Sequence, residues 1–392
     1  MIRIAILGST GSIGKSALKV IERHPERFRV VGLAANRSAE ALARQVARHR
    51  PRVAVLADEP AMSAGAAHFD DGVCQGGRDA LLALAEAPDV DIVINALVGA
   101  AGLEPTLRAL ENGKRVALAN KESLVAGGSL VPEAAERGGG ELIPIDSEHS
   151  AILQCIEGYS RESISKVVLT ASGGPFRGWS RRELREVRPE QALRHPTWEM
   201  GAKITVDSAT LANKALEVIE AHFLYGIPYD RIEVVVHPQS IVHSLVEFVD
   251  GSVLAQVGEP TMELPILYAL SYPERVADVS LRTFDLIGAS PLTFETVDVE
   301  CFPLFALGVG AGRAGSAGPA AFNAANEIAV NAFLAEEIRF HEMAEVVSAV
   351  LGRVGAEPLR NIDDVLRADR AARDAARHAI EQLQHSRVKL HP

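Results

Sequence analysis

Three acidic side chains in this sequence could bind a metal ion together. Asp146 and Glu148 follow the apolar run 142–145, and Glu217 lies in a helical pattern further along the chain. If they share a cleft, each close pair repels by about 4 kcal/mol at an effective dielectric constant of roughly 20, so a positive group must lie between them. Without cysteine or paired histidine ligands, Mg²⁺ or Mn²⁺ is favoured over zinc. Alternatively, Asp146 caps a helix starting at Ala151, and Glu148 complements its dipole.

The segment that carries Glu217 could also recognise an anion. Residues 203–208 favour a short strand, and the following residues have the apolar period of a helix, with Ser208 at the expected N-cap. Helical spacing puts Asn213, Lys214 and Glu217 together, away from the apolar face. Ser208 at the N-cap, just after a strand end, makes a site that could receive an anion. The alternative is an ordinary solvated helix face.

Another polar segment ends a predicted strand at residues 167–170. Ser172, Gly173 and Gly174 come shortly after it. Successive backbone N–H groups in such a glycine-rich turn can cradle a phosphate. The alternative is a plain tight turn.

The stretch from Arg185 to Gly201 carries His195, Trp198 and Met200 without a clear helical or strand period. Its polarity requires a surface position, because a buried loop would leave backbone groups without hydrogen bonds. Trp198 and Met200 are unusual on an exposed loop, so we expect a lid over about 185–201 that closes when phosphate binds. The alternative is that these side chains fasten the loop to the core.

A glycine loop at residues 8–14 directly follows the first apolar run and opens a helix. Its G-x-x-G-x-x-G spacing differs from G-x-G-x-x-G, but its glycines also allow close backbone approach, and the helix N-terminus can receive a pyrophosphate. The second strand ends at Asn36-Arg37-Ser38, without the acidic residue that holds an NAD ribose. Arg37 can pair with a 2′-phosphate instead. We therefore expect NADPH, with Arg37 as discriminator; the alternative is a solvated surface arginine.

These residues need a framework of strands and helices to bring them together. The β-rich runs are 2–7, 28–34, 52–56, 92–96, 115–119 and 142–145, and the helical patterns between them include 13–23, 39–48, 80–87 and 103–111. This alternation is typical of an α/β fold with a doubly wound parallel sheet. Ligands of such sheets bind at the carboxyl ends of the strands. We predict that residues 1–145 form the NADPH-binding domain.

Beyond residue 145 the pattern becomes mixed. Apolar runs at 232–236, 241–249 and 252–257 favour a mixed or antiparallel sheet, so we predict an α+β catalytic domain over 146–270. Residues 271–297 are interpreted as a linker. Residues 298–392 are expected to form a C-terminal helical bundle domain, in which a flexible glycine loop at 308–318 precedes helices from Pro319 onward.

The composition excludes several classes of protein. The chain has 392 residues, of which 47% are hydrophobic, which is enough for two or three cores and too apolar for a disordered chain. A net charge of -11 argues against the phosphate-backbone footprint of a nucleic-acid-binding protein. The longest apolar run, 92–103, is shorter than the roughly 18 residues of a membrane span. With no secretory signal at the start of the sequence, we expect a cytoplasmic enzyme without a membrane partner.

The cysteines offer no framework for disulfides or zinc. Cys74, Cys155 and Cys301 lie far apart and form no C-x-x-C motif. This spacing argues against both kinds of site. Each is expected to be a small buried hydrophobic residue.

A series of motifs runs through the chain from residue 8 to residue 327. Besides the glycine loop they are Ala119-Asn120-Lys121-Glu122-Ser123-Leu124, Ile145-Asp146-Ser147-Glu148-His149-Ser150, Ser172-Gly173-Gly174-Pro175-Phe176, His195-Pro196-Thr197-Trp198-Glu199-Met200-Gly201, Asp207-Ser208-Ala209-Thr210 with Asn213, Lys214 and Glu217, and Phe322-Asn323-Ala324-Ala325-Asn326-Glu327. In this order they resemble the 1-deoxy-D-xylulose 5-phosphate reductoisomerase family. The resemblance covers the whole architecture and implies a Rossmann-like N-terminal domain, a catalytic domain that also dimerises and a C-terminal helical domain.

The resemblance also implies a reaction and its partners. Members of the family convert 1-deoxy-D-xylulose 5-phosphate, a small sugar phosphate, into 2-C-methyl-D-erythritol 4-phosphate in the non-mevalonate isoprenoid pathway. They are homodimers that use NADPH and a divalent metal, Mg²⁺ or Mn²⁺ and possibly Co²⁺. Asn36 stands where the family often has glycine; asparagine tolerates the left-handed conformation, so we expect the turn to survive.

Carried over residue by residue, the resemblance assigns three groups of site residues. The metal ligands would be Asp146, Glu148 and Glu217, which with Lys121 form the catalytic set. The substrate would contact Lys121, Ser147, Glu148, Ser172, His195, Trp198, Met200, Ser208, Asn213, Lys214 and Glu217. NADPH would contact Thr10, Gly11, Ser12, Ile13, Asn36, Arg37, Ser38, Asn120, Glu122 and Gly201.

Two other functions fit part of the pattern. A semialdehyde dehydrogenase can begin with a similar loop, but it needs a nucleophilic cysteine. Cys155, the only cysteine near the domain junction, lies in an apolar helical pattern where a thiolate is disfavoured. A non-enzymatic NADP sensor would have no reason to gather three carboxylates. Loss of turnover on metal chelation, with the fold kept, would distinguish a reductoisomerase from both.

Overall fold

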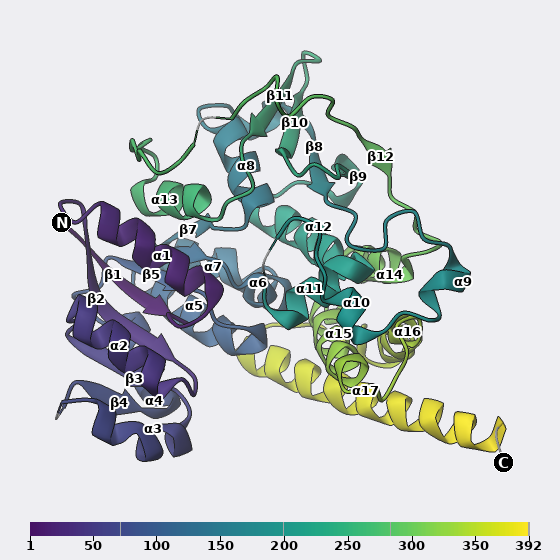
Figure 1. The fold of residues 1–392 in the computed structure, drawn as a ribbon, viewed down its shortest axis with the longest axis horizontal. Coiled ribbons are helices and arrows are strands. Elements are labelled where there is room, and N and C mark those ends of the chain that lie inside the picture. The colour runs from purple at the N-terminus through teal and green to yellow at the C-terminus, as the bar shows by residue number, and fades with distance from the viewer. Residues whose placement is uncertain (71, 199, 283, 391–392) are drawn as a thin grey trace. The chain divides into compact units, whose positions relative to one another are not determined.

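The computed structural model describes residues 1–70, 72–198, 200–282 and 284–390, with the side chains of 387–390 left aside. Glu199 of the predicted lid, Thr283 of the predicted linker and the last two residues of the predicted C-terminal domain lie outside the described residues. The chain forms two compact units (Figure 1). The first comprises residues 1–124, 129–150 and 261–282, and the second comprises 125–128, 151–260 and 283–392. The finer division into 1–145, 146–270, linker and 298–392 stays a prediction.

The first unit is built on a seven-stranded, all-parallel sheet in the order β4-β3-β2-β1-β5-β6-β7. The strands are β1 Ile2–Leu7, β2 Phe28–Ala35, β3 Val53–Leu56, β4 Cys74–Gly76, β5 Ile92–Asn95, β6 Arg115–Leu118 and β7 Glu141–Pro144. The main helices between them are α1 Ser12–Arg23, α2 Ala39–His49, α3 Glu59–Gly65, α4 Gly77–Glu86, α5 Leu103–Glu111, α6 Lys121–Gly127 and α7 Leu130–Gly138. The doubly wound parallel sheet expected from the sequence is confirmed.

The strand order reverses between β1 and β5, and the glycine loop lies at this point. Gly8 has φ +90°, and a Cβ there would lie 2.3 Å from the carbonyl oxygen of Ala96, just after β5. At the carboxyl end of β1 the loop therefore lies so close to the segment after β5 that only glycine fits at position 8. This is the crevice in which doubly wound sheets bind their ligands.

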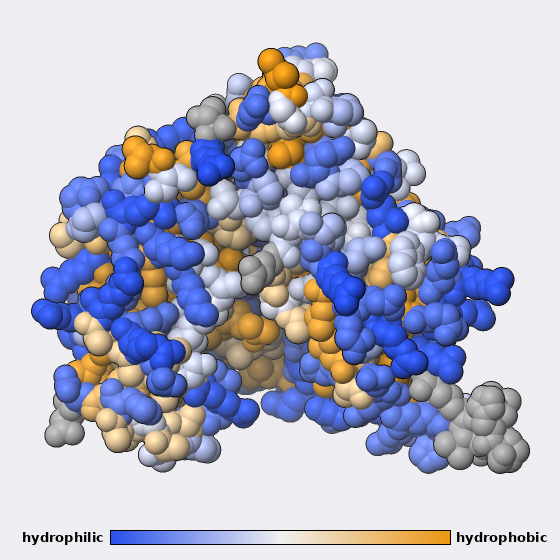
Figure 2. Space-filling view, viewed as in Figure 1, coloured by the Kyte–Doolittle hydropathy of each residue, from blue (hydrophilic) through white to orange (hydrophobic). Residues whose placement is uncertain are grey.

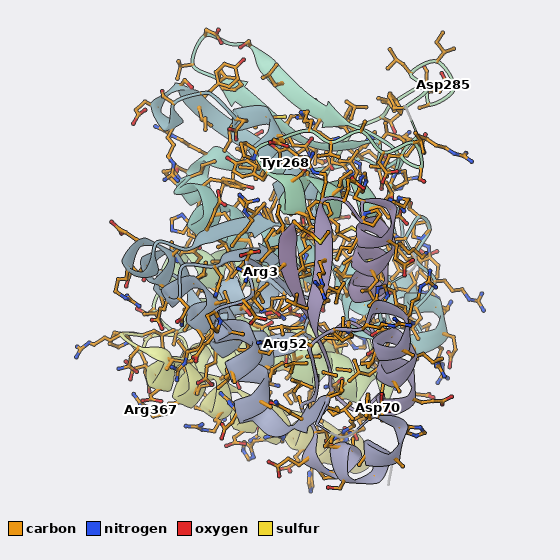
Figure 3. All side chains as sticks on the ribbon, turned by 90° about the vertical axis from the view of Figure 1, so that its left-hand side faces the viewer. Arg3, Arg52, Asp70, Tyr268, Asp285 and Arg367 are labelled. Carbon is orange, nitrogen blue, oxygen red and sulfur yellow. The ribbon has the colours of Figure 1, made fainter. Side chains whose placement is uncertain are left out.

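Ion pairs fasten the first unit together. Asp91 accepts hydrogen bonds from the backbone N–H of Arg3 at 2.7 Å and from its guanidinium at 2.6 Å, which ties the start of β1 to the residue before β5. Figure 3 labels Arg3 among the strands of this sheet. The helix α13, Glu263–Ser271, packs on the same unit. Asp278, just beyond it, is paired with Arg23 at 2.8 Å and His24 at 3.1 Å. These contacts hold a segment distant in sequence against α1.

The second unit contains a five-stranded mixed sheet in the order β11-β10-β8-β9-β12. The strands are β8 Ile164–Ala171, β9 Ile232–Val236, β10 Val242–Phe248, β11 Val253–Val257 and β12 Glu295–Thr296. Only the β8–β9 pair is parallel, so the expected mixed sheet is confirmed. Helices α8, Ser147–Ile156, and α12, Ala212–Tyr225, share its core through Ile152, Cys155 and Val218.

The remaining helices of the second unit form a packed bundle. They are α9 Arg181–Leu184, α10 Pro189–Ala192, α11 Ala202–Thr210, α14 Pro303–Ala314, α15 Gly318–Leu334, α16 Glu342–Val354 and α17 Ile362–Leu390. The flexible glycine loop predicted at 308–318 is wrong, because α14 runs through most of it. A Cβ on Gly308 would lie 2.6 Å from atoms of Ala215 and Phe322. Gly308 therefore allows the helices to pack closely and does not indicate a loop.

The strand predicted at 203–208 is also wrong, since this segment lies in α11. Its β-branched residues favoured a strand, but in the helix Lys203 pairs with Asp207 one turn later at 2.8 Å, and Val206 is fully buried. Tertiary burial has overridden the local preference. Ser208 consequently lies in the last turn of α11, and the residue before α12 is Leu211, with φ +60°.

Among the residues that the structure describes, no helix is both long enough and apolar enough to cross a membrane.

Candidate active site

Asp146 lies between β7 and α8, and both of its carboxylate oxygens are engaged. Oδ1 accepts the backbone N–H groups of Glu148 at 3.2 Å and His149 at 3.5 Å, so Asp146 does cap α8. Oδ2 lies 2.9 Å from Nζ of Lys121. The capping alternative left open by the sequence is therefore correct for Asp146, although the helix begins at Ser147 and not at Ala151. The cap coexists with a buried lysine that a simple cap does not need.

Lys121 begins α6 directly after the strand β6, and its side chain is only 7% exposed. Its charge is thus removed from bulk water and must be balanced locally. Asp146 provides that balance within the first unit. Next to it, the Ser147 hydroxyl donates to Oε2 of Glu148 at 2.5 Å, which fixes this second carboxylate.

The helix α12 carries Asn213, Lys214 and Glu217. Lys214 and Glu217 are almost completely buried and form an ion pair, so the solvated-face alternative is wrong for both. Asn213 donates from Nδ2 to Oε1 of Glu217 at 2.5 Å. Burying a lysine and a glutamate in this way costs desolvation free energy, which their mutual attraction offsets only in part. This face can offer a cationic donor and a carboxylate to one ligand.

The turn after β8 packs against α11. Ser172 Oγ accepts the backbone N–H of Gly174 at 3.2 Å. Gly174 has φ +67°, and a Cβ there would lie 2.7 Å from the carbonyl oxygen of Ser208. The structure thus brings Ser172 and Ser208 onto adjoining segments. Ser208 reaches this place from the end of α11, not from the N-cap expected for the next helix.

His195 connects the predicted lid to this turn. Its Nδ1 accepts the backbone N–H groups of Thr197 at 3.1 Å and Trp198 at 2.8 Å, while Nε2 lies 3.0 Å from Ser172 Oγ. Because Nδ1 is an acceptor, the neutral ring carries its proton on Nε2 and donates it to Ser172. Burial lowers the pKa of His195, which keeps the ring neutral near pH 7. Trp198 and Met200 are half-buried.

The glycine loop leaves the start of α1 uncapped by any side chain. Gly11 occupies the N-cap without a side-chain hydrogen bond, and the first turn holds no acidic residue. Gly11 and Ser12 are exposed, with Thr10 and Ile13 half-buried. Helix N-terminal N–H groups and a favourable dipole are thus presented to an anion.

Arg37 and Asp58 form a pair at the carboxyl ends of β2 and β3. Arg37 is largely exposed, and its Nε donates to Asp58 Oδ2 at 2.9 Å. Asp58 also accepts the Ala61 N–H at 2.9 Å, and these contacts lower the pKa of its carboxyl. The sequence did not identify Asp58 as this partner. Asn36 and Ser38 are exposed, and Asn36 does not adopt the left-handed conformation, so its turn does not need glycine.

Asn120 has a structural task in the first unit. Its Nδ2 donates to the carbonyl oxygens of Leu97 at 2.8 Å and Gly99 at 3.0 Å, and its Oδ1 accepts the Ser123 N–H at 2.9 Å. Glu122 is buried beside it, with Asn120 Nδ2 3.2 Å from its carboxylate. These bonds organise the loop after β5 and the start of α6. Gly201, at the N-cap of α11 in the second unit, is exposed.

Asp207 and Asn326 lie in two of the sequence motifs, but the sequence did not indicate a role for either. In the structure Asn326 Nδ2 donates to Asp207 Oδ1 at 2.7 Å, and both residues are buried. A hydrophobic helix that carries buried asparagines could have drawn attention to α15. Its partner could not be identified, because the contact joins segments more than a hundred positions apart.

Models of known families match three successive parts of this chain. The model described as 1-deoxy-D-xylulose 5-phosphate reductoisomerase matches residues 4–128, that of its C-terminal domain matches 142–225, and that of the DXP reductoisomerase C-terminal domain matches 257–375. A 1-deoxy-D-xylulose 5-phosphate reductoisomerase from Symbiobacterium thermophilum is 51% identical over 381 residues, covering 95% of this chain and 97% of the relative. The one from Mycobacterium avium is 51% identical over 395 residues, covering 99% and 95%.

Solved structures of the same enzyme have the same fold. The Zymomonas mobilis enzyme in complex with NADPH superimposes with a TM-score of 0.90 at 41% identity, covering 97% of this chain and 99% of its own. A reductoisomerase structure in complex with NADPH, fosmidomycin and magnesium gives a TM-score of 0.92 at 38% identity, covering 98% and 99%. This chain belongs to the 1-deoxy-D-xylulose 5-phosphate reductoisomerase family.

Proposed function

We propose that this chain converts 1-deoxy-D-xylulose 5-phosphate into 2-C-methyl-D-erythritol 4-phosphate, with NADPH and a divalent metal ion. Family membership over nearly the whole chain supports this reaction. The observation that carries it is the buried polar face of α12, where Lys214, Glu217 and Asn213 join in one network. Apolar side chains of the same size would avoid the desolvation cost of this buried lysine and glutamate, which supports a role for the pair beyond packing.

The donor set fits a hard divalent cation. Asp146, Glu148 and Glu217 form a group of carboxylates that could hold a metal ion, and carboxylate oxygens are the ligands that Mg²⁺ and Mn²⁺ prefer. Glu148 lies in the first turn of α8, and Ile152, one turn later, belongs to the same core as Val218 of α12. We propose these three residues as ligands of Mg²⁺ or Mn²⁺, with Co²⁺ as a further candidate.

The chain's own residues would perform binding, orientation and charge balance. When bound, the metal ion would polarise the substrate oxygens, and NADPH would supply a hydride. Lys214, Asn213, Ser172 and Ser208 would hold the phosphate. Lys121 beside Asp146 would stabilise negative charge as it develops on the substrate. Ser147 keeps Glu148 oriented, and we propose that both line the substrate.

The lid over 185–201 remains a proposal, supported by the bond between His195 and Ser172. Through this bond, a ligand that contacts Ser172 would act directly on the segment that holds Trp198 and Met200. Closure would exclude water from the aldehyde that precedes reduction.

The proposed reaction is tested by NADPH oxidation. Purified protein with 1-deoxy-D-xylulose 5-phosphate and Mg²⁺ or Mn²⁺ should oxidise NADPH and yield 2-C-methyl-D-erythritol 4-phosphate. Removing the metal with a chelator should abolish turnover, with circular dichroism unchanged and activity restored by added Mg²⁺. NADPH oxidation that survives the chelator, or a protein inactive with this substrate under every metal, would contradict the proposal.

Cofactor choice gives a prediction for Arg37. Arg37→Glu should reduce the preference for NADPH over NADH by about 10- to 100-fold, because a charge-assisted contact to the 2′-phosphate becomes repulsive. Only Nε of Arg37 has a partner among the described residues, so its Nη atoms can face a phosphate. The ratio of kcat/KM values for the two cofactors measures the effect. Arg44→Glu, an exposed arginine on α2, is the control; equal ratios in both variants would exclude Arg37 as discriminator.

We also propose a homodimer that acts in the cytoplasm. Strand β11 is an edge of the five-stranded sheet, and Val253 and Leu254 on it are exposed, as is Val249 nearby. Figure 2 shows hydrophobic residues at the top of the view, near β11. An exposed apolar edge strand is suited to pairing with a second copy. Sedimentation of Val253→Lys beside the wild type would reveal whether this edge forms the dimer.

A further inference from the structure

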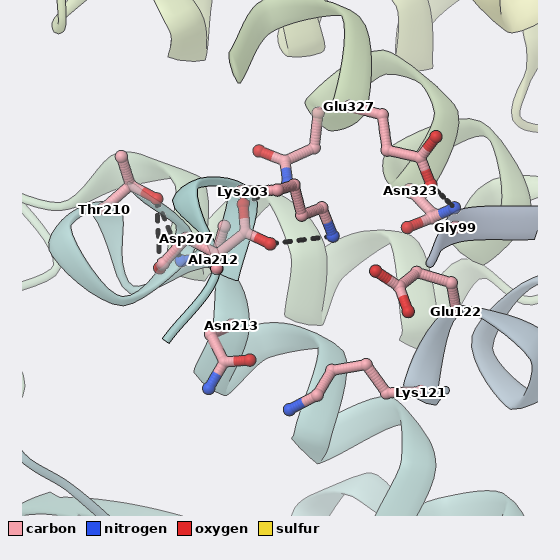
Figure 4. A network of polar contacts seen from close by, with 12 residues as sticks. Gly99, Lys121, Glu122, Lys203, Asp207, Thr210, Ala212, Asn213, Asn323 and Glu327 are labelled. Atoms are coloured by element: carbon pink, nitrogen blue, oxygen red, sulfur yellow. Dashed lines mark hydrogen bonds and ion pairs between the residues drawn. The ribbon is translucent and has the colours of Figure 1, made fainter. Parts of the chain in front are cut away.

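The end of α11 that carries Ser208, which we proposed above as a phosphate-binding residue, is tied to the C-terminal helices by a buried polar contact as well as by the apolar packing of Val206 and Ala209. Asp207 is 1% exposed, and its two carboxylate oxygens have different partners. Oδ2 pairs with Lys203 at 2.8 Å, within the same helix, and Oδ1 accepts a hydrogen bond from Nδ2 of Asn326 on α15 at 2.7 Å. Figure 4 shows the Lys203–Asp207 pair beside the helices of the C-terminal part. Of these two contacts, only the one with Asn326 can fix α11 relative to another element.

Burying the amide of Asn326 costs desolvation free energy, and its hydrogen bond to Asp207 offsets part of that cost. Asn326 is completely buried, and its Oδ1 finds no partner among the residues that the structure describes. A buried amide with one side unmet is less favourable than an apolar side chain of the same volume. The bond to Asp207 is therefore what this side chain contributes.

The neighbouring residue, Ser208, leaves little room for α11 to shift. A Cβ added to Gly174 would lie only 2.7 Å from the carbonyl oxygen of Ser208. The turn that carries Ser172 is therefore in close contact with α11. Asn326 anchors the same helix through Asp207. A small displacement of α11 would change the spacing between the two proposed phosphate-binding serines.

Helix α15 is itself held by the last helix. Glu327, next to Asn326, pairs with Arg373 of α17 at 2.6 Å, and Arg373 also pairs with Asp369 at 2.7 Å. Asn323 donates to Glu327 at 3.0 Å (Figure 4). Helix α15 therefore has polar contacts with two other elements: Glu327 pairs with Arg373 of α17, and Asn326 bonds separately to Asp207 of α11.

We propose that Asn326 is a positioning residue for the phosphate subsite: through Asp207 it fixes α11 so that Ser208 and the Ser172 turn fit one phosphate group. This inference rests on the proposed function, because it assumes that these serines bind the substrate phosphate. Asn326 itself touches neither phosphate nor cofactor. Its loss should therefore weaken phosphate recognition and leave the dinucleotide subsite intact.

The test compares variants on both sides of the bond. Asn326→Leu keeps the volume but removes the donor, and Asp207→Ala removes the acceptor. Both should raise KM for 1-deoxy-D-xylulose 5-phosphate and the Kd for fosmidomycin, measured by calorimetry, by about 10-fold or more, because misplacement by a fraction of an ångström is strongly felt. The Kd for NADPH should stay within about twofold and kcat within about threefold.

Two variants separate positioning from general stability. Asp207→Asn keeps an oxygen that Asn326 can donate to, so it should restore most of the affinity lost in Asp207→Ala. Asn323→Leu removes an equally buried amide one turn away, which bonds to Glu327 instead. It should leave KM within about twofold of wild type even if it lowers Tm as much as Asn326→Leu does.

The outcomes distinguish this inference from the proposed function. If the wild type turns over substrate but Asn326→Leu leaves KM and the fosmidomycin Kd unchanged, the positioning role is wrong. If Asn323→Leu and Asn326→Leu raise KM and the fosmidomycin Kd equally, the effect is only structural and the inference also fails. A wild type without turnover contradicts the proposed function itself. Should Asn326→Leu fail to fold, the Asp207→Ala and Asp207→Asn pair decides.

Discussion

Glu217→Gln should lower kcat/KM by about 100-fold or more, with the NADPH Kd within about twofold of wild type. The substitution removes one negative charge from the proposed metal site, and metal polarisation of a substrate contributes several kcal/mol to such reactions; each 1.36 kcal/mol is a factor of about ten in rate. The glutamine keeps an oxygen for Asn213 to donate to, so the helix should remain folded. Steady-state kinetics at limiting Mg²⁺ and titration of Mn²⁺ binding measure the two effects.

The matched control is Glu220→Gln, on the same helix and equally buried. It should keep kcat/KM within about threefold, because Glu220 is not among the proposed ligands. The measured metal Kd should rise in Glu217→Gln and stay unchanged in Glu220→Gln. If Glu217→Gln binds Mn²⁺ as tightly as wild type, Glu217 is not a ligand. A similar loss of metal affinity is expected for Asp146→Asn.

Lys214→Met should raise KM for the phosphorylated substrate by about 10- to 100-fold. A hydrogen bond between charged groups in a desolvated site contributes roughly 1.5–3 kcal/mol, and the side chain of Lys214 is 4% exposed. Methionine retains most of the apolar contact of the lysine stem, so packing changes little. Removing the lysine also removes the Lys214–Glu217 ion pair, which competes with a cation for the carboxylate, so metal binding should tighten while phosphate binding weakens.

These opposite changes provide the check. Lys114→Met removes another buried lysine, in the first unit, where Nζ donates to the carbonyl oxygen of Ala87 at 2.8 Å. It should affect stability but not KM. An unchanged KM in Lys214→Met, with the fold intact, would mean that Lys214 balances Glu217 and does not bind phosphate.

Much of the first unit could be predicted from the sequence because its signals are local. Strand-forming runs, turns and amphipathic helices repeat in a regular alternation, and each is set by residues within about ten positions of one another. The glycine loop could be placed at the end of β1 because its spaced glycines directly follow the first apolar run and precede a helical pattern. Short strands such as β4 and helices such as α6 were not predicted, since they carry few periodic positions.

The errors arose where distant packing overrides local preference. Residues 203–208 have the composition of a strand, yet the buried Asp207 needs both Lys203, one helical turn away, and Asn326. Glycine disfavours helices, so Gly308 indicated a loop; in the structure it allows α14 to pack closely on Ala215 and Phe322. In both cases a contact between distant segments decides the conformation, and no window of sequence contains it.

By itself, the sequence determined which residue types could supply the proposed site: carboxylates for a hard cation, serines beside a glycine-rich turn or a helix start for an anion, and a glycine loop with Arg37 for a dinucleotide. These are properties of residue type and short spacing. Only the tertiary structure decided that Lys214 and Glu217 are buried together, that Asp58 pairs with Arg37, and that Asn326 anchors Asp207. Burial and hydrogen-bond partners depend on contacts between segments far apart in the chain, because the free energy of a charge or an amide is set by what surrounds it in space.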